Sequence, residues 1–165
     1  MKIIKIVLIC CFISILSVFL YKNINGKPFG GLRSTDLSKI NIDNIYLGEN
    51  IHNVDLSKYI PNDTLSDYDY NFNKLRLNVD SSGKINKILV NHSEGKLLSI
   101  NGTTDLNNIS DIRDKVGRYY KDLIFDKQQG LNFYKYVDKD SKIIAKFVYS
   151  IDTNELVWSI FEKTD

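Results

Sequence analysis

The chain of 165 residues contains few cysteines and histidines, and each shortage excludes a kind of site. Its two cysteines, Cys10 and Cys11, lie together inside a hydrophobic run near the N-terminus. The rest of the chain therefore has no disulfide framework and no thiolate chemistry. The two histidines, His52 and His92, stand in polar surroundings without further nitrogen or sulfur ligands at metal-site spacing. We predict that both are surface residues and that no zinc site exists.

An excess of charge of either sign is also missing. The chain has 22 Lys and Arg residues against 20 Asp and Glu residues. Four of the lysines precede Pro28 and no acidic residue does, so the chain from Pro28 onward carries 18 basic and 20 acidic residues, a net charge of −2. Nucleic-acid binding depends on clustered Lys and Arg side chains. We therefore predict no nucleic-acid partner.

Recognisable catalytic and ligand-binding motifs are absent as well. The acidic turns at 138–140 and 152–155 lack the glycine and the bidentate glutamate of an EF-type calcium loop. The Gly30-Gly31 pair has no strand before it and no Gly-Lys-Ser/Thr after it, which excludes a phosphate loop. Composition leaves a Ser-His-Asp triad open, because a triad is recognised by geometry, but no nucleophile elbow is present. We predict a non-enzymatic protein without cofactor or metal.

The N-terminus, by contrast, is strongly hydrophobic. Residues 6–21 carry no charge, and Ile3 and Ile4 extend the apolar run past Lys5 toward the about 20 residues that cross a bilayer. We predict a signal-anchor transmembrane segment over residues 1–22, which enters the membrane through residues 3–21. The predicted localisation is a single-pass cell-membrane protein with its C-terminal domain outside. Secretion after signal cleavage is the alternative, which the bulky residues at the end of the run disfavour.

The next segment, residues 23–44, has the composition of a flexible tether. Gly26, Gly30 and Gly31 are a third of the nine glycines, and Pro28 is one of only two prolines. Large apolar residues are few and follow no sustained period, as in flexible linkers.

The C-terminal part, residues 105–165, has the clearest pattern. Asn108 and Asp111 are typical of a helix N-terminus, and apolar residues follow at helical spacing until about residues 122–126. Three alternating segments with short polar turns between them come next: 131–137, 143–151 and 156–161. The pattern predicts an antiparallel meander with one face packed on a helix.

Residues 45–104 repeat this order at an offset of 58 positions, at which Val137 and Asp138 correspond to Val79 and Asp80. The predicted elements of this first unit are a short helix and three strands: 54–60, 75–79, 85–91 and 97–100. Chance similarity of two hairpins is the alternative explanation. The predicted fold class is α+β, an N-terminal transmembrane helix followed by two tandem units, each a helix packed on an antiparallel β-meander.

Two such units, with the helical stripe Ile112, Val116 and Tyr119, resemble the β-lactamase-inhibitory protein and SmpA-type lipoprotein architecture. The similarity covers most of residues 45–162. It departs from that family because the first unit shows no two-helix hairpin and no cysteine. The resemblance implies a protein-binding module whose concave sheet face meets a partner.

Aromatic residues are the feature that most suggests a binding face. Sixteen of the Phe, Trp and Tyr residues lie after the hydrophobic N-terminus. Tyrosines on an exposed sheet face are typical anchors of protein interfaces, although core packing is the alternative. The candidate partner-binding residues occupy alternating positions in two segments: Tyr68, Tyr70, Phe72, Tyr134 and Tyr136.

The sequence therefore predicts a membrane-anchored, extracytoplasmic protein-binding module. An immunity or inhibitor role against a secreted toxin, bacteriocin or lytic enzyme suits a small tethered domain. The alternative is a structural accessory of an envelope process such as secretion, wall assembly or sporulation. A third hypothesis is an unrecognised wall hydrolase.

Overall fold

A computed structural model describes residue 29 and residues 31–164, and it divides the chain into two compact units, 1–31 and 32–165. The predicted signal-anchor segment, 1–22, lies outside the described residues. Among the described residues, no helix is long and apolar enough to cross a bilayer. The prediction of a single-pass membrane protein with an N-terminal transmembrane helix is therefore contradicted. The fold described below is that of the second unit.

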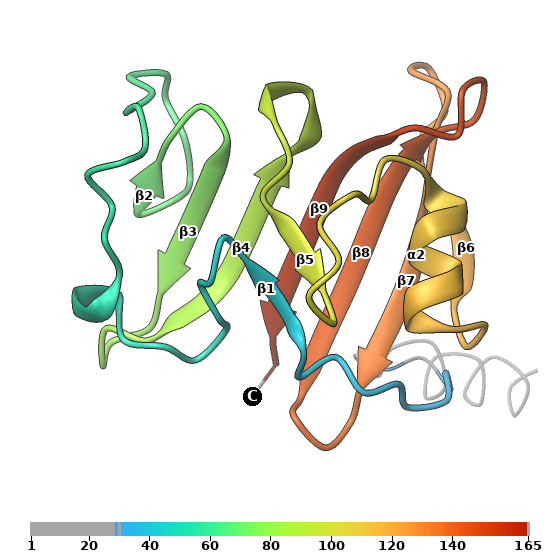
Figure 1. The fold of residues 1–165 in the computed structure, drawn as a ribbon, viewed down its shortest axis with the longest axis horizontal. Helices are drawn as coiled ribbons and strands as arrows, with labels where there is room; N and C mark the ends of the chain where they lie inside the picture. Colours follow the sequence, from blue (N-terminus) through green and yellow to red (C-terminus); the bar gives the residue numbers. More distant parts are fainter. Residues whose placement is uncertain (1–28, 30, 165) are drawn as a thin grey trace, which may run out of the picture. The chain divides into compact units, whose positions relative to one another are not determined.

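The second unit is built around a seven-stranded antiparallel sheet with the strand order β2-β3-β4-β9-β8-β7-β6 (Figure 1). Its strands are, in chain order, β2 (Tyr70–Asn71), β3 (Leu75–Val79), β4 (Ile85–Asn91), β6 (Lys121–Asp126), β7 (Leu131–Asp138), β8 (Ile143–Ser150) and β9 (Leu156–Lys163). A separate two-stranded sheet pairs β1 (Ile40–Ile42) with β5 (Leu98–Ile100). One α-helix, α2 (Ile109–Val116), and two short 3-10 turns, η1 (Ile51–Asn53) and η2 (His92–Glu94), complete the described elements.

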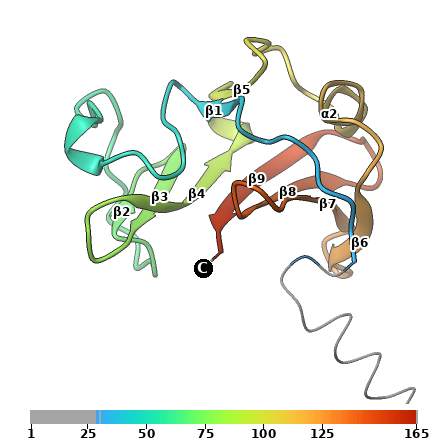
Figure 2. The same cartoon turned by 90° about the horizontal axis from the view of Figure 1, so that it is seen from below.

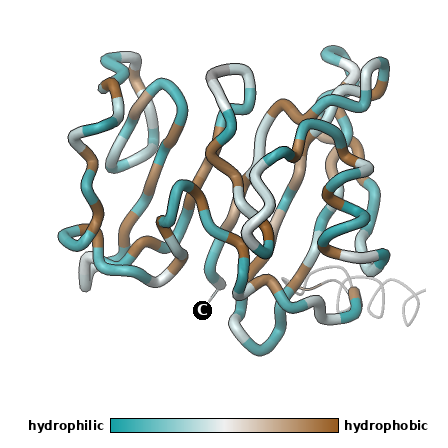
Figure 3. Tube along the Cα trace, in the orientation of Figure 1, coloured by the Kyte–Doolittle hydropathy of each residue, from teal (hydrophilic) through white to brown (hydrophobic). Residues whose placement is uncertain are grey.

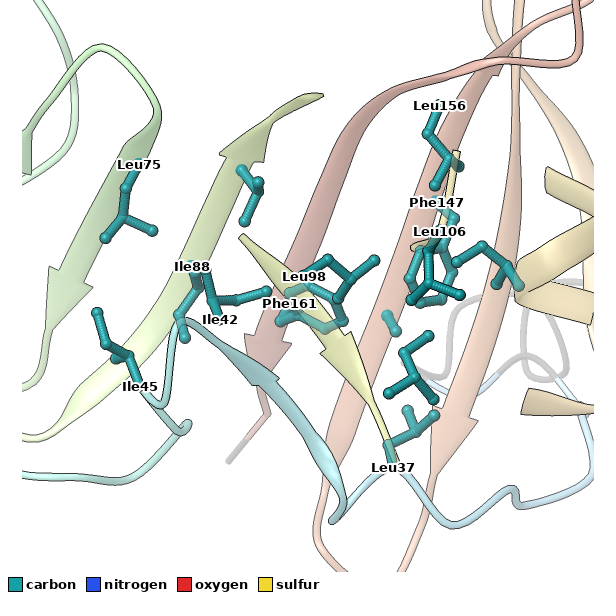
Figure 4. Packing of buried hydrophobic residues seen from close by; sticks show 14 of the residues in the cluster. Leu37, Ile42, Ile45, Leu75, Ile88, Leu98, Leu106, Phe147, Leu156 and Phe161 are labelled. Carbon is teal, nitrogen blue, oxygen red and sulfur yellow. The ribbon is translucent and has the colours of Figure 1, made fainter. Parts of the chain in front are cut away.

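The β1–β5 ribbon and α2 both lie on the same face of the large sheet (Figures 1 and 2). Beneath them the strands place apolar side chains at alternate positions, which appear as brown segments along the strands in Figure 3. Leu75, Ile88, Phe147 and Phe161 from four different strands are almost completely buried there (Figure 4). This layer is the main hydrophobic core.

The helix is shorter than the sequence predicts, and its end has a local cause. A capping box between Asn108 and Asp111 begins α2 as expected. Gly117 follows Val116 with φ at +109°, a conformation that glycine adopts readily and that ends the helix. Residues 121–126, predicted as the last helical turns, instead form edge strand β6, which pairs with β7.

The predicted fold class is wrong, because the second unit is one mostly β layer with a single α-helix. No α-helix forms among residues 45–104, and irregular chain after η1 replaces the predicted helix at 54–60. The predicted third strand of that segment, 97–100, forms β5, which lies outside the large sheet and pairs with β1. Strand β9 takes the place beside β4, with Phe161 opposite Ile88, and joins both halves of the sequence in one sheet.

The predicted tether also ends earlier than residue 44. From Ser34 onward the chain is fastened to the turn between β7 and β8. Thr35 N donates to the Val137 carbonyl at 2.8 Å, and Leu37 N donates to Asp138 Oδ2 at 3.1 Å. Leu37 is 2% exposed. Residues 34–44 therefore belong to the folded unit.

Candidate protein-binding face

The second face of the large sheet, opposite β1, β5 and α2, carries no described helix or strand (Figure 2). We call it the open face. Residues directly opposite one another in antiparallel pairs share a face, so the register identifies its side chains. From β4, β7, β8 and β9 these are Lys87, Leu89, Asn91, Leu131, Phe133, Lys135, Val137, Ile144, Lys146, Val148, Ser150, Trp158, Ile160 and Glu162.

The five aromatic residues predicted from the sequence do not form one surface. Tyr136 is completely buried, and its hydroxyl donates to the Gly117 carbonyl at 2.9 Å. Burial raises its pKa. Phe72 is buried against Tyr59, with ring centroids 5.5 Å apart.

The other three are half-buried and lie apart from one another. Tyr134 faces the core side, opposite Phe147, and stacks on Tyr120 with centroids 3.8 Å apart. Tyr70 is also on the core side, opposite Leu77. Tyr68 has the Lys87 ammonium 5.4 Å from its ring centroid and therefore borders the open face.

On β7, the predicted binding residues Tyr134 and Tyr136 point to the opposite side of the sheet from the open face. The sequence shows two alternating sets on this strand, Phe133 with Val137 and Tyr134 with Tyr136. The register places Tyr134 and Tyr136 opposite Phe147 and Ala145, on the core side. Phe133 therefore points to the open face, and the tyrosines do not.

An apolar row crosses the open face at the level of Phe133. Leu123, Phe133, Val148 and Trp158 lie directly opposite one another on β6, β7, β8 and β9. Val148 is 0% exposed, so the accessible surface of the row comes from the other three, which are half-buried. Phe125 extends this row, with its ring centroid 6.1 Å from that of Phe133 and 5.6 Å from that of Trp158. Phe125 is 42% exposed. These residues were not among the predicted partner-binding residues, because the sequence alone does not show which side of each strand is covered.

A shallow pocket of about 260 Å³ lies at one end of the apolar row. Phe125, Trp158, Leu89 and Ile160 form its apolar lining, and Arg76 and Asn91 add polar groups. The pocket therefore offers an aromatic wall beside a cation and an amide. This combination is typical of the sites that take the anchor residues of a partner protein.

A row of lysines runs beside the apolar row. Lys121, Lys135 and Lys146 lie directly opposite one another on β6, β7 and β8. Like charges at directly opposed positions destabilise a sheet. Burial lowers the pKa of Lys135, and the positive charges of Lys146 and Lys121 lower it further. Three lysines from three strands therefore lie close together on this face.

One carboxylate lies within this positive region. Glu162 is the only acidic side chain that β4, β7, β8 and β9 place on the open face. Its two oxygens lie 3.0 Å from the ammonium groups of Lys87 and Lys146. Burial acts to raise the Glu162 pKa, but hydrogen bonds from the two lysines outweigh it and hold the pKa below its usual value. Glu162 therefore stays ionised and offsets only part of the positive charge.

The described residues also contain a serine–histidine pair, which belongs to the core. His92 Nε2 lies 2.8 Å from Ser159 Oγ, and burial lowers the His92 pKa to about 4. His52 is exposed, as predicted, whereas His92 is half-buried. Ser159 is 0% exposed, so its hydroxyl is closed to a substrate. Within the described part of the chain, no group of three or more His, Cys, Asp and Glu side chains is placed to hold a metal ion.

The structure shows no feature specific to nucleic-acid binding among the described residues, since the lysine row is short and adjoins a continuous apolar row. No protein-family model, curated protein or solved structure matches the chain.

Proposed function

We propose that this protein is a binding module and that its open face docks on another protein. The partner presents apolar side chains to the row around Trp158 and Phe125, and carboxylates to the lysine row. An immunity or inhibitor protein, which blocks a toxin or a lytic enzyme by covering it, is the form of this function that we favour. The open face thus replaces the predicted aromatic residues as the candidate partner-binding surface.

The observation that carries the proposal is the adjacency of the two rows on one face. Successive residues on the same side of a strand are about 7 Å apart, so a partner that covers Phe133 also reaches Lys135. The few residues that dominate binding energy in protein interfaces are enriched in tryptophan, tyrosine and arginine. A carboxylate of the partner that docks beside the exposed Lys121 gains a charge-assisted contact, which favours an acidic partner and speeds its approach.

A matched pair of double variants of the full chain tests the proposal. F125A/K121E removes an exposed ring and reverses a charge on the open face. Y46A/K39E makes the same changes at exposed residues away from it. Each protein is immobilised and exposed to the exported proteins of the organism that encodes it. Any retained protein is purified and titrated against all three forms.

We expect a partner whose affinity falls at least about tenfold with F125A/K121E, because a hot-spot ring and a complementary charge are both lost. Its affinity for Y46A/K39E should equal that for the unmodified chain. Binding should also weaken as salt concentration rises, since salt screens the exposed lysines. A partner that binds all three forms equally would contradict the proposal.

A further inference from the structure

A second pocket, unrelated to the open face, lies between β1 and the turn that joins β7 to β8. Its volume is about 420 Å³, which is within the range of small-molecule sites. Five apolar side chains that are at most 3% exposed contribute to its lining, and Figure 4 labels all of them: Leu37, Ile42, Ile45, Ile88 and Phe161. The pocket therefore lies over the edge of the main core, and its accessible apolar surface comes from the half-buried Ile40, Leu47 and Ile143.

The rim of this pocket is polar and carries more positive than negative charge. Lys142 and Lys163 line it together with a single carboxylate, that of Asp140. Tyr46, which is 44% exposed, contributes an aromatic ring. An apolar interior with a few polar groups at its mouth is the usual design of a site for a small amphipathic molecule.

Lys163 is the most informative residue of the rim. The register places it opposite Ile143, on the core side of the sheet and on the same side as Phe161. On β4, β8 and β9 it is the only charged side chain on that side. Its ammonium lies 3.2 Å from the position that a Cβ atom on Gly48 would occupy, so it lies against the loop after β1.

Neither rim ammonium is neutralised within the described part of the chain. The Lys142 carbonyl accepts hydrogen bonds from Thr164, which fixes its backbone, but the side-chain nitrogens of Lys142 and Lys163 make no hydrogen bond or ion pair there. Two free cations over an apolar pocket favour an anionic group attached to an apolar body.

We propose that this pocket binds a single-chain amphiphile with an anionic head group, the chain lying against Ile40 and Ile143 and the head group between Lys142 and Lys163. A carboxylate and a phosphate monoester share the required chemistry. The site is independent of the open face, and neither proposal depends on the other.

The test titrates the full chain with four ten-carbon probes below their micellar concentrations: decanoate, decyl phosphate, decanol and decyltrimethylammonium. Backbone amide shifts locate the binding and give the affinities. Three variants accompany it. K142A/K163A removes the rim charges, and I40F fills the pocket, whose lining includes Ile40. K139A is the matched control, because Lys139 is an exposed lysine of the same turn outside the lining.

We expect decanoate, decyl phosphate or both to bind, with shifts at Ile40 and Ile143 and none at Phe125. K142A/K163A should weaken binding about tenfold or more, since charge-assisted contacts are lost, and I40F should weaken it as well. K139A should leave it unchanged. Stronger binding of decanoate identifies a carboxylate, and stronger binding of decyl phosphate a phosphate ester. No binding, equal binding of the neutral or cationic probe, or indifference to K142A/K163A would overturn the proposal.

Discussion

At the scale of single residues, His92 links folding to pH. His92 is half-buried, and its ring nitrogen lies 2.8 Å from the buried Ser159 hydroxyl. Burial lowers its pKa to about 4, whereas an unfolded chain restores the usual value near 6.5. The unfolded state therefore takes up a proton first as the pH falls, which destabilises the fold between pH 6.5 and pH 4.

We predict that the unfolding free energy falls by about 3 kcal/mol because of this histidine when the pH is lowered from 7 to 4. H92Q should remove that part of the pH dependence and leave the carboxylate contributions in place. Urea denaturation at both pH values measures it. H52Q is the control, because His52 is exposed and should leave the profile unchanged. Identical profiles for H92Q and the unmodified chain would refute the assignment.

For the candidate site, the local sequence pattern predicts the strands but not which of their two sides is exposed. Alternation on 131–137 predicts a two-sided strand correctly, but it does not say which side is covered. The answer depends on β8, which places Phe147 opposite Tyr134 through a pairing that the sequence of β7 does not contain. For the same reason the lysine row is invisible in the sequence, since its three members are brought together only by the register.

At the scale of elements, the turn between β7 and β8 fastens the N-terminal segment of the unit. Asp138 is 3% exposed and accepts hydrogen bonds from the backbone nitrogens of Leu37, Asp140 and Ser141. The corresponding turn between β3 and β4 has Asp80, which is exposed and accepts bonds only from nearby Ser82 and Lys84.

D138A should therefore cost about 2–3 kcal/mol of unfolding free energy, because three donors lose their acceptor and water reaches them poorly. D80A should cost about 1 kcal/mol or less, since solvent replaces the lost carboxylate. Chemical denaturation compares the two, and hydrogen exchange at the Leu37 amide should accelerate in D138A alone. Equal losses in both variants would show that Asp138 is only a local turn residue.

Most strands, unlike the helix end, are predictable from the sequence. The segments 75–79 and 85–91 form strands as predicted, because apolar alternation and turn residues define them locally. The helix was extended too far because Tyr119, Tyr120 and Leu123 continue its spacing by coincidence. In the structure Gly117 ends the helix, and the residues from Lys121 onward pair with the edge of β7 as strand β6.

At the scale of the whole folded unit, the pairing of β4 with β9 decides the architecture. The offset of 58 positions suggests two separate units. In the structure, however, β9 pairs with β4 and so joins the two halves in one sheet, whereas β5 pairs with β1 outside that sheet. Pairing over such sequence separations is not encoded by a local pattern, and so the sequence analysis missed it.

Residues 32–165 should accordingly unfold in one transition. Phe161 is buried at the join, opposite Ile88 on one side and Ala145 on the other. F161A should cost about 3–5 kcal/mol, as is usual for a buried phenylalanine. It should accelerate hydrogen exchange in β3 and in β7 alike. Acceleration confined to β7 and β8, or two separate denaturation transitions, would restore the two-unit description.

The central claim, that the open face meets a partner protein, is tested most directly by photo-crosslinking in the cells that make the chain. The crosslinker p-benzoylphenylalanine is placed in the full chain either at Phe125 or at Tyr46, two aromatic residues of similar exposure. The account predicts a discrete protein adduct at position 125 that K121E diminishes, and no such adduct at position 46. Adducts at position 46 alone, or equal adducts at both positions, would contradict it.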